Sequence, residues 1–425
     1  MLNKTILLYK DSFRGLSSEI WWLTLITFIN RAGTMVLPFL SLYLIENLEF
    51  TLTQVGWIMS SFGLGSLLGS WLGGKLTDRF GYYKVMYISL FLTGIMFILL
   101  QFVTTFEGFV LAVFFTLMIA DTFRPALFVS LKAYSKKENQ TRSLTLIRLA
   151  INLGFSFGPF LGGLIIAGFG YSGLFWVDGI TCISAVILMI KVLPNPPLRE
   201  DVADEDSSPV GSEGKIARDL PYITFLVAVF LMGFVFLQLF TTMPLYYKEV
   251  YELTEVHIGL IISMNGFLIF LLEMPLIHTI EKKMLNKMKI VTWSMAMLGM
   301  SYLMLNFGHA IAILIISMFL ITIGEMMAFP FTNNFAMNRA PIGKEGDYMA
   351  WYSMAFSLSH IFSAKVGMEL IEKFGYGFNW YVMGGLGFVA MFLIYRLQRM
   401  LVHEKENLSR AKLVVELEPQ KNTEE

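Results

Sequence analysis

The chain has 425 residues, of which 56% are apolar and only 15% are charged, and its 32 basic residues balance 32 acidic ones. A water-soluble domain of this length could not hide so much apolar surface, so the composition excludes an ordinary soluble fold. The balanced charge gives no reason to expect a nucleic acid partner. We therefore expect a helical protein that lies in a lipid bilayer.

Apolar runs of about 20 residues recur along the chain, which is the length that a helix needs to cross roughly 30 Å of hydrocarbon. The sequence predicts an all-α membrane protein with twelve transmembrane helices in two six-helix halves. The expected spans are residues 20–45, 55–74, 84–104, 108–132, 142–168, 172–193, 220–247, 256–280, 288–307, 309–336, 346–371 and 377–399.

A proline-rich and acidic segment between the sixth and seventh spans is expected to be a solvated linker. The domains are then an N-terminal half (1–193), the linker (194–219), a C-terminal half (220–400) and a tail (401–425). Lys and Arg gather in the linker, the tails and alternate loops, which places both termini and the linker in the cytoplasm. We expect a multi-pass protein of the plasma (inner) membrane.

A charged, glycine-rich stretch follows the second expected span, at residues 73–84 (Gly-Gly-Lys-Leu-Thr-Asp-Arg-Phe-Gly-Tyr-Tyr-Lys). Its glycines allow a tight turn and a close approach of helices. Asp78 and Arg79 place opposite charges at the membrane surface. We expect a short, rigid connection that latches helix ends together on one face of the bundle.

This stretch resembles the signature of the major facilitator superfamily in the loop between helices two and three. The residues that match the signature are Gly74, Leu76, Asp78, Arg79 and Gly81. The chain departs from it at Tyr82 and Tyr83, where the family usually carries basic residues. The resemblance implies the major facilitator fold and a secondary transporter of a small-molecule substrate. We expect it to act as a monomer.

The fifth expected span carries small residues at helical spacing, Gly154, Gly158 and Gly162, together with Pro159. Such glycines let another helix pack backbone to backbone, and proline removes a helical hydrogen bond. The pattern can be a packing seam alone, or a bend and sliding surface that alternating access requires. It resembles the antiporter motif of the drug:proton branch of the superfamily.

Charged residues inside apolar spans are costly there and usually face a cavity or a partner. The candidate substrate- or proton-binding residues are Arg31, Asp121, Arg124, Glu273 and Glu325. Asp121 lies three residues from Arg124 and is expected to stay ionised. Glu325 has no basic residue within a turn of its own helix, so it is the first candidate for the proton or cationic-substrate site. Glu273 is the second.

Internal salt bridges are the alternative explanation for every such charge. Lys365 and Glu369, four residues apart on one helix, are expected to pair with each other. Asp178 lies near the outer end of the sixth expected span, where solvation is a simple alternative explanation for its charge.

Two further stretches resemble known transporters. Residues 30–44 resemble the first helix of drug exporters and proton-dependent oligopeptide transporters, and residues 324–341 resemble the tenth helix of the peptide transporters. In the peptide family two glutamates precede the arginine that matches Arg31, whereas this chain has Thr27 and Asn30. The resemblance implies proton-coupled efflux of small amphipathic molecules or drugs. The alternatives are proton-coupled transport of short peptides or other polar solutes, and a membrane sensor or scaffold.

The sequence offers no sign of catalysis or of a bound cofactor. His257, His309 and His360 lack the spacing of metal ligands, so no metal site is expected. No phosphate-binding loop is present, so ATP is not expected to drive the protein. We expect neither an enzyme nor a cofactor.

Overall fold

The computed structural model describes residues 15–136, 139–195, 219–341 and 345–417, and the regular structure of these residues is helical. The helices are α2 (Ser18–Ala32), α3 (Val36–Glu46), α4 (Leu52–Phe80), α5 (Tyr82–Leu100), α6 (Phe106–Asp121), α7 (Phe123–Tyr134), α8 (Gln140–Phe169), α9 (Ser172–Val192), α10 (Leu220–Phe236), α11 (Gln238–Thr241), α12 (Met243–Glu249), α13 (Glu255–Lys282), α14 (Lys287–Met304), α15 (Ile311–Arg339) and α16 (Glu345–Leu417). The all-α membrane fold class is confirmed.

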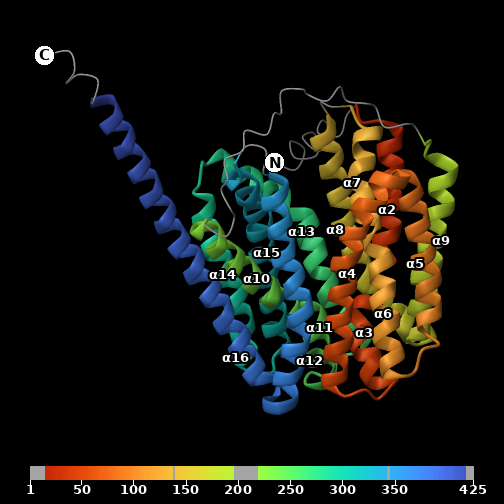
Figure 1. The fold of residues 1–425 in the computed structure, drawn as a ribbon. Coiled ribbons are helices and arrows are strands. Elements are labelled where there is room, and N and C mark those ends of the chain that lie inside the picture. Colours follow the sequence, from red (N-terminus) through yellow and green to blue (C-terminus); the bar gives the residue numbers. More distant parts are fainter. Residues whose placement is uncertain (1–14, 137–138, 196–218, 342–344, 418–425) are drawn as a thin grey trace, which may run out of the picture.

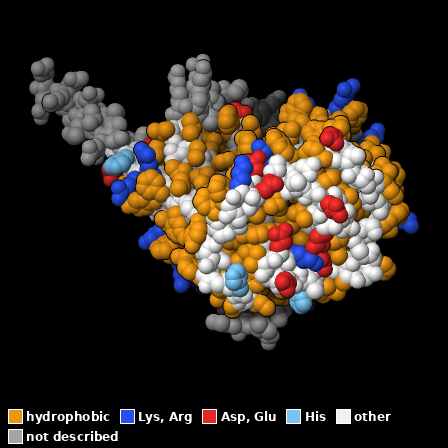
Figure 2. Space-filling model, turned by 90° about the horizontal axis from the view of Figure 1, so that it is seen from below, with side chains coloured by type: hydrophobic (Ala, Val, Ile, Leu, Met, Phe, Trp, Pro, Cys, Tyr) orange, Lys and Arg blue, Asp and Glu red, His pale blue; other side chains and the backbone are white. Residues whose placement is uncertain are grey.

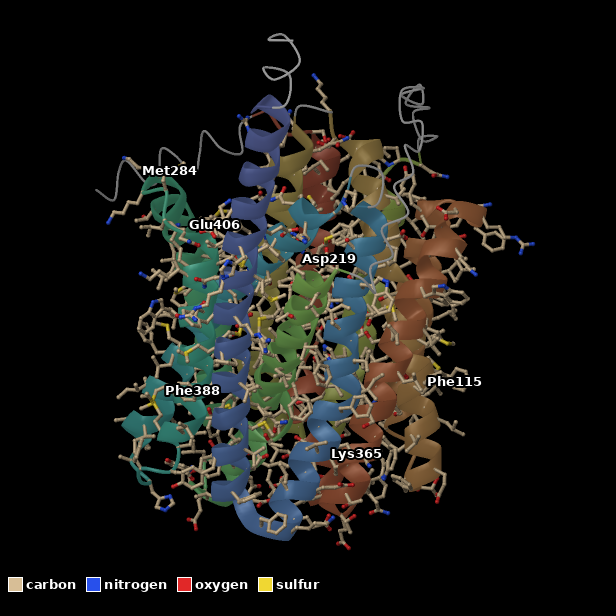
Figure 3. All side chains as sticks on the ribbon, turned by 60° about the vertical axis from the view of Figure 1, so that its left-hand side comes forward. Phe115, Asp219, Met284, Lys365, Phe388 and Glu406 are labelled. Atoms are coloured by element: carbon tan, nitrogen blue, oxygen red, sulfur yellow. The ribbon has the colours of Figure 1, made fainter. Side chains whose placement is uncertain are left out.

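Ten helical segments in the described residues are long and apolar enough to cross a membrane. The longest of them covers both arms of α16, which turns back at Gly375, where φ is 81°. Helix α14 has 18 residues and lies outside those ten. The count of twelve spans stays a prediction. Large apolar side chains such as Phe115 point away from the bundle (Figure 3), as they do in a protein surrounded by lipid.

Helices α2–α9 form one group and helices α10–α16 form a second group beside it (Figure 1). We call the end of the bundle where α2 begins and α16 ends the terminal end. The opposite end, which holds Glu46, Lys248 and Gly375, is called the far end (Figure 1). The expected linker at 194–219 lies almost wholly outside the described residues. Helix α16 continues to Leu417, through much of the expected tail.

Three of the expected spans are interrupted, which corrects the prediction that they are continuous. The interruptions separate α2 from α3, α6 from α7, and α10 from α12. The second part of each span has a proline in its first turn, namely Pro38, Pro125 and Pro244. Proline lacks an N–H and clashes with the carbonyl four residues earlier, so the preceding helix cannot run through it unchanged.

The charged stretch at 73–84 is also different from the expected loop. Helix α4 runs through it to Phe80, and Gly81 alone connects α4 to α5 with φ of 83°. Only glycine adopts this left-handed conformation readily, which explains the one-residue turn. Asp78 and Arg79 are exposed in the last turn of α4, at the terminal end.

The two groups of helices contact each other mainly through α8 with α13 and through α4 with α16. At the far end, the Lys248 ammonium group lies 3.5 Å from Glu46 of the first half and pairs with Glu255 of its own half. The Tyr171 hydroxyl donates a 2.7 Å hydrogen bond to Glu46. Figure 2 views this end, and acidic and basic groups gather over the middle of the face. The far end is therefore fastened across the two halves.

Glycines bring the backbones of the two halves into direct contact. A Cβ atom added at Gly163 of α8 would lie 2.5 Å from the carbonyl oxygen of Glu255. One added at Gly259 of α13 would lie 2.3 Å from the carbonyl oxygen of Pro159. Real Cβ atoms do not come so close, so these seams need glycine.

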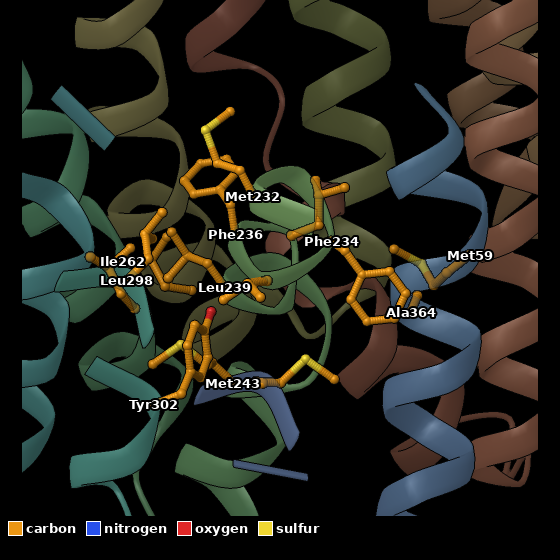
Figure 4. Packing of buried hydrophobic residues seen from close by; sticks show 14 of the residues in the cluster. Met59, Met232, Phe234, Phe236, Leu239, Met243, Ile262, Leu298, Tyr302 and Ala364 are labelled. Carbon is orange, nitrogen blue, oxygen red and sulfur yellow. The ribbon is translucent and has the colours of Figure 1, made fainter. Parts of the chain in front are cut away.

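The largest buried apolar cluster also includes residues of both halves. Figure 4 shows part of it, where Phe234 of α10 lies near Met59 of α4 and Ala364 of α16, and Met243 and Tyr302 lie on the other side of α11. Burial of such side chains stabilises the closed arrangement of the halves.

At the terminal end the second half is fastened within itself. Asp219, just before α10 (Figure 3), accepts hydrogen bonds of 2.8 and 2.9 Å from Arg339 at the end of α15. Arg339 also pairs with Glu404 of α16 at 2.6 Å. Partial burial opposes ionisation of Asp219, but the hydrogen bonds from Arg339, the Tyr222 N–H and the Tyr348 hydroxyl, together with the charge of Arg339, outweigh it and hold the pKa of Asp219 below its ordinary value.

Candidate functional site

A cavity of about 440 Å³ lies between the two halves. All five charged residues proposed from the sequence line it, namely Arg31, Asp121, Arg124, Glu273 and Glu325. Three of them lie at helix interruptions: Arg31 in the last turn of α2, Asp121 at the end of α6, and Arg124 in the first turn of α7. The interrupted helices thus present charged side chains in the interior of the bundle, as in other transporters with discontinuous helices.

The first half contributes three arginines (Arg31, Arg124 and Arg148) and one carboxylate, Asp121, to this cavity. The Asp121 carboxylate accepts a hydrogen bond from the Ser66 hydroxyl. The Arg31 guanidinium lies 5.8 Å from the centre of the Phe155 ring, and its buried Nε atom has no hydrogen-bond partner among the described residues. Arg31 therefore retains a donor for which the described protein supplies no acceptor.

Glu273 of the second half is held by the first half. Its Oε1 atom lies 2.9 Å from Arg148 Nη2, and its Oε2 atom accepts a 3.3 Å hydrogen bond from the Asn152 side chain. The Glu273 side chain is 9% exposed and the Arg148 side chain 51%. This ion pair joins α8 to α13 at the cavity wall, so Glu273 has a structural role in the closed arrangement.

Glu325 has a different environment. Its Oε2 atom accepts a 2.8 Å hydrogen bond from the Asn265 amide, which also donates to the Thr322 hydroxyl at 3.1 Å. No ion pair to Glu325 occurs within the described ranges. Asp121 likewise has a neutral hydrogen-bond partner, Ser66, but Glu325 is the second-half cavity carboxylate without an ion pair to a described residue.

Aromatic side chains form much of the remaining wall. They are Phe62, Phe97, Phe123, Phe155, Phe236, Phe240, Phe329 and Phe356. His360 stacks on Phe62 from the opposite half, with 6.2 Å between ring centres. Apolar walls with a few converging polar groups are typical of sites that hold small organic molecules.

The glycines of the fifth span face the first span, not the cavity. A Cβ atom at Gly154 would lie 2.5 Å from Arg31 Cβ, and one at Gly162 would lie 2.9 Å from the Phe39 ring. Gly158 lies against the Ala32 and Thr34 carbonyls. The packing interpretation is confirmed, while a gating role for these glycines and Pro159 stays a prediction. A gating role also stays a prediction for four residues that lie away from the cavity, Gly74, Asp78, Arg79 and Gly81.

Two other expectations for charged residues have opposite outcomes. Lys365 and Glu369 pair at 3.3 Å, as expected, and Lys365 also lies 4.1 Å from the Trp57 ring centre. The interpretation of Asp178 as a solvated residue is wrong, because its side chain is completely buried. It accepts backbone hydrogen bonds from Met35 and Val36.

Several polar residues around the cavity were not among the sequence candidates. They are Ser66, Arg148, Asn152, Asn265 and His360. A polar side chain within an apolar span is visible in the sequence, but which ones face a common cavity depends on how the helices pack. Within the described ranges no cluster of His, Cys, Asp and Glu could hold a metal ion.

Comparison with known proteins gives relatives of similar length. The Na(+), Li(+), K(+)/H(+) antiporter of Planococcus maritimus is 20% identical over 87% of this chain and 93% of its own. Multidrug resistance protein 2 of Bacillus subtilis is 21% identical over 75% of this chain and 80% of its own. The crystal structure of a POT family transporter in complex with a thioalcohol-conjugated peptide has a TM-score of 0.77 at 17% identity, covering 91% of this chain and 97% of that one.

The family model described as "Major Facilitator Superfamily" matches residues 21–364, which is most of the chain. The helical bundle agrees with the fold of the solved transporter, and the relatives found are transporters, not enzymes. This chain belongs to the major facilitator superfamily of transporters.

Proposed function

We propose that this protein is a proton-coupled secondary transporter that exports small amphipathic molecules or drugs by alternating access. The observation that carries the proposal is a cavity between the halves with aromatic walls and a carboxylate of the second half, Glu325, that forms no ion pair with a described residue. A volume of about 440 Å³ suits a small organic molecule. The names of two relatives, an antiporter and a multidrug resistance protein, agree with it.

The proposal places the protein as a monomer in the plasma (inner) membrane, with both termini in the cytoplasm. The distribution of Lys and Arg supports that orientation. The far end then faces outward, and its contacts between Lys248, Glu46 and Tyr171 close the outer side. The moving units are the halves 1–193 and 220–400, and this arrangement is the one that opens inward.

In this scheme Glu325 binds either a proton or a cationic group of the substrate, because each compensates the same buried charge. Competition between the two for one carboxylate couples proton entry to substrate exit. Arg148 and Glu273 join the halves at the cavity wall, so this ion pair must separate when the halves rearrange.

A second candidate function is the transport of short peptides or other polar solutes. The arrangement that favours it is Arg31 on one half and Glu325 on the other, both facing the same cavity. Opposite charges placed in this way match a solute that carries both signs. The likeness to a solved peptide-bound transporter agrees with this candidate.

The two candidates are separated by transport assays with purified protein in liposomes. We expect ethidium to move against its gradient when a pH difference is imposed, and labelled dialanine not to exchange. Dialanine counterflow without ethidium movement would favour the second candidate. Transport that ignores the pH difference for both solutes would contradict proton coupling. Protein-free liposomes are the control.

A further inference from the structure

A buried carboxylate outside the cavity lining holds the interruption of the first span. The Asp178 side chain of α9 is completely buried. Its Oδ1 atom accepts a 3.0 Å hydrogen bond from the backbone N–H of Met35, and its Oδ2 atom accepts one of 2.9 Å from the N–H of Val36. Both donors lie at the start of α3, which has no side-chain cap of its own.

These two N–H groups need an acceptor because the helix is interrupted before them. The Gly33 and Thr34 N–H groups still bond back to the Ile29 and Arg31 carbonyls of α2. The Met35 and Val36 N–H groups begin a new helix, and the first N–H groups of a helix have no partner within it. Met35 and Val36 are each only 3% exposed, so bulk water does not satisfy these groups either. A carboxylate suits this place, since the N-terminal end of a helix also favours negative charge.

The interruption lies between two neighbouring helices that fix its position. A Cβ atom at Gly33 would lie 1.9 Å from the Thr181 hydroxyl of α9, one turn after Asp178. The Asn30 amide donates to the Cys182 thiol, also on α9, at 3.5 Å. On the other side, a Cβ atom added at Gly154 of α8 would lie 2.5 Å from Arg31 Cβ, so α8 packs directly against this part of α2. Arg31, in the last turn of α2, is thereby held at the cavity wall.

We propose that Asp178 is a positioning residue of the transport site: by capping α3 it maintains the interruption of the first span and directs Arg31 into the cavity. Asp178 itself does not line the cavity, so it acts through the backbone. It also occupies the free N-terminal end of α3, which would otherwise attract a substrate anion. Arg31 is left as the group of the first span that meets an anionic part of the substrate.

The inference rests on the proposed function only in taking the cavity as the substrate site, and its test needs neither substrate nor gradient. The background is Cys182→Ser, which removes the single cysteine. Arg31→Cys then introduces a thiol at the cavity wall, and Ser357→Cys introduces one at the cavity wall of the second half. The alkylation rate of each thiol by N-ethylmaleimide is measured with Asp178, with Asp178→Ala and with Asp178→Asn.

We expect Asp178→Ala to slow alkylation at position 31 by about tenfold, because thiol reactivity follows exposure, and to leave position 357 within about twofold. Asp178→Asn, which keeps the shape and one acceptor, should lie between. If Asp178→Ala does not fold, Asp178→Asn carries the test with an expected loss of at least about threefold at position 31. Ser359→Ala removes a 2.7 Å bond between α16 and α10 and serves as the matched control.

Equal rates at position 31 with and without Asp178 would overturn the proposal. So would an equal decrease at positions 31 and 357, because that result indicates general loosening. Either outcome would leave the transport assays above unaffected, and a failure of those assays would leave the alkylation result standing.

Discussion

The three carboxylates of the cavity differ in the groups that compensate their charge. Glu273 has Arg148, Asp121 has the Ser66 hydroxyl on its own half, and Glu325 has the Asn265 amide. An amide can serve an ionised carboxylate and a protonated one, whereas an arginine strongly favours the ionised form. The three residues therefore have different capacities to exchange a proton during transport.

Glu325→Gln is expected to abolish transport driven by a pH gradient and to leave substrate exchange largely intact. Glutamine keeps the shape and the contact with Asn265 but cannot bind or release a proton. Uptake with an imposed pH gradient and exchange at equal pH are measured in the same liposomes. Glu369→Gln, at an ion pair outside the cavity lining, should retain gradient-driven transport. Accumulation by Glu325→Gln in response to the gradient would show that another carboxylate couples.

At the scale of the helix, α8 has two glycine faces with different partners. Gly154 and Gly162 contact the first span, within one half. Gly163 contacts α13, in the other half. The same change of glycine to a larger residue should therefore act on folding at one face and on the arrangement of the halves at the other.

Gly154→Val should lower the free energy of unfolding by about 1–3 kcal/mol, the usual effect of overpacking. Gly163→Val should leave the melting temperature close to the wild-type value. It should instead separate α8 from α13 and favour opening at the far end. Thermal unfolding and the distance between spin labels at positions 47 and 252, two exposed positions of the far end, measure the two effects. The idea of separate faces fails if both variants only lower stability, or if the Gly163→Val distance matches wild type.

At the scale of the whole molecule, the two halves are closed at the far end and the signature motif is not engaged. Asp78 is exposed and forms no ion pair with any described residue, and a Cβ atom at Gly74 would have open space around it. A rearrangement that closes the terminal end would bring this part of α4 toward the start of α16. The positive end of that helix could then stabilise the Asp78 carboxylate.

Asp78→Asn is accordingly expected to leave thermal stability within about 0.5 kcal/mol in this arrangement, as for an exposed surface residue. Transport should fall several-fold, because the opposite arrangement loses its contact, while substrate binding persists. Glu107→Gln, at an exposed carboxylate of the far end, is the control and should transport normally. Wild-type transport by Asp78→Asn would contradict the latch.

Much of the architecture follows from short stretches of sequence and could therefore be predicted. Apolar runs of membrane-spanning length give the helices, because each run must satisfy its own backbone hydrogen bonds within the bilayer. The cost of a charge in hydrocarbon likewise identified Arg31, Asp121, Arg124, Glu273 and Glu325 as residues that face an interior cavity, and all five line it.

The prolines show what the local sequence cannot predict, namely whether a helix breaks. Pro38 and Pro125 follow helix interruptions, whereas Pro159 and Pro330 lie inside the continuous helices α8 and α15. The sequence by itself indicates a weakened hydrogen-bond ladder at every one of these positions. Whether the helix breaks depends on neighbours that satisfy the freed backbone groups, and these are known only from the tertiary structure.

Asp178 is the sharpest case. Its place near the predicted end of a span suggested a solvated carboxylate, yet its partners are backbone N–H groups 142 and 143 residues away in the chain. The sequence alone determined that this protein is a bundle of membrane helices with charges in its interior. Only the packing of the helices decided which charges share a cavity and which one supports the backbone, because hydrogen bonds and ion pairs act over a few ångströms between residues that the sequence keeps far apart.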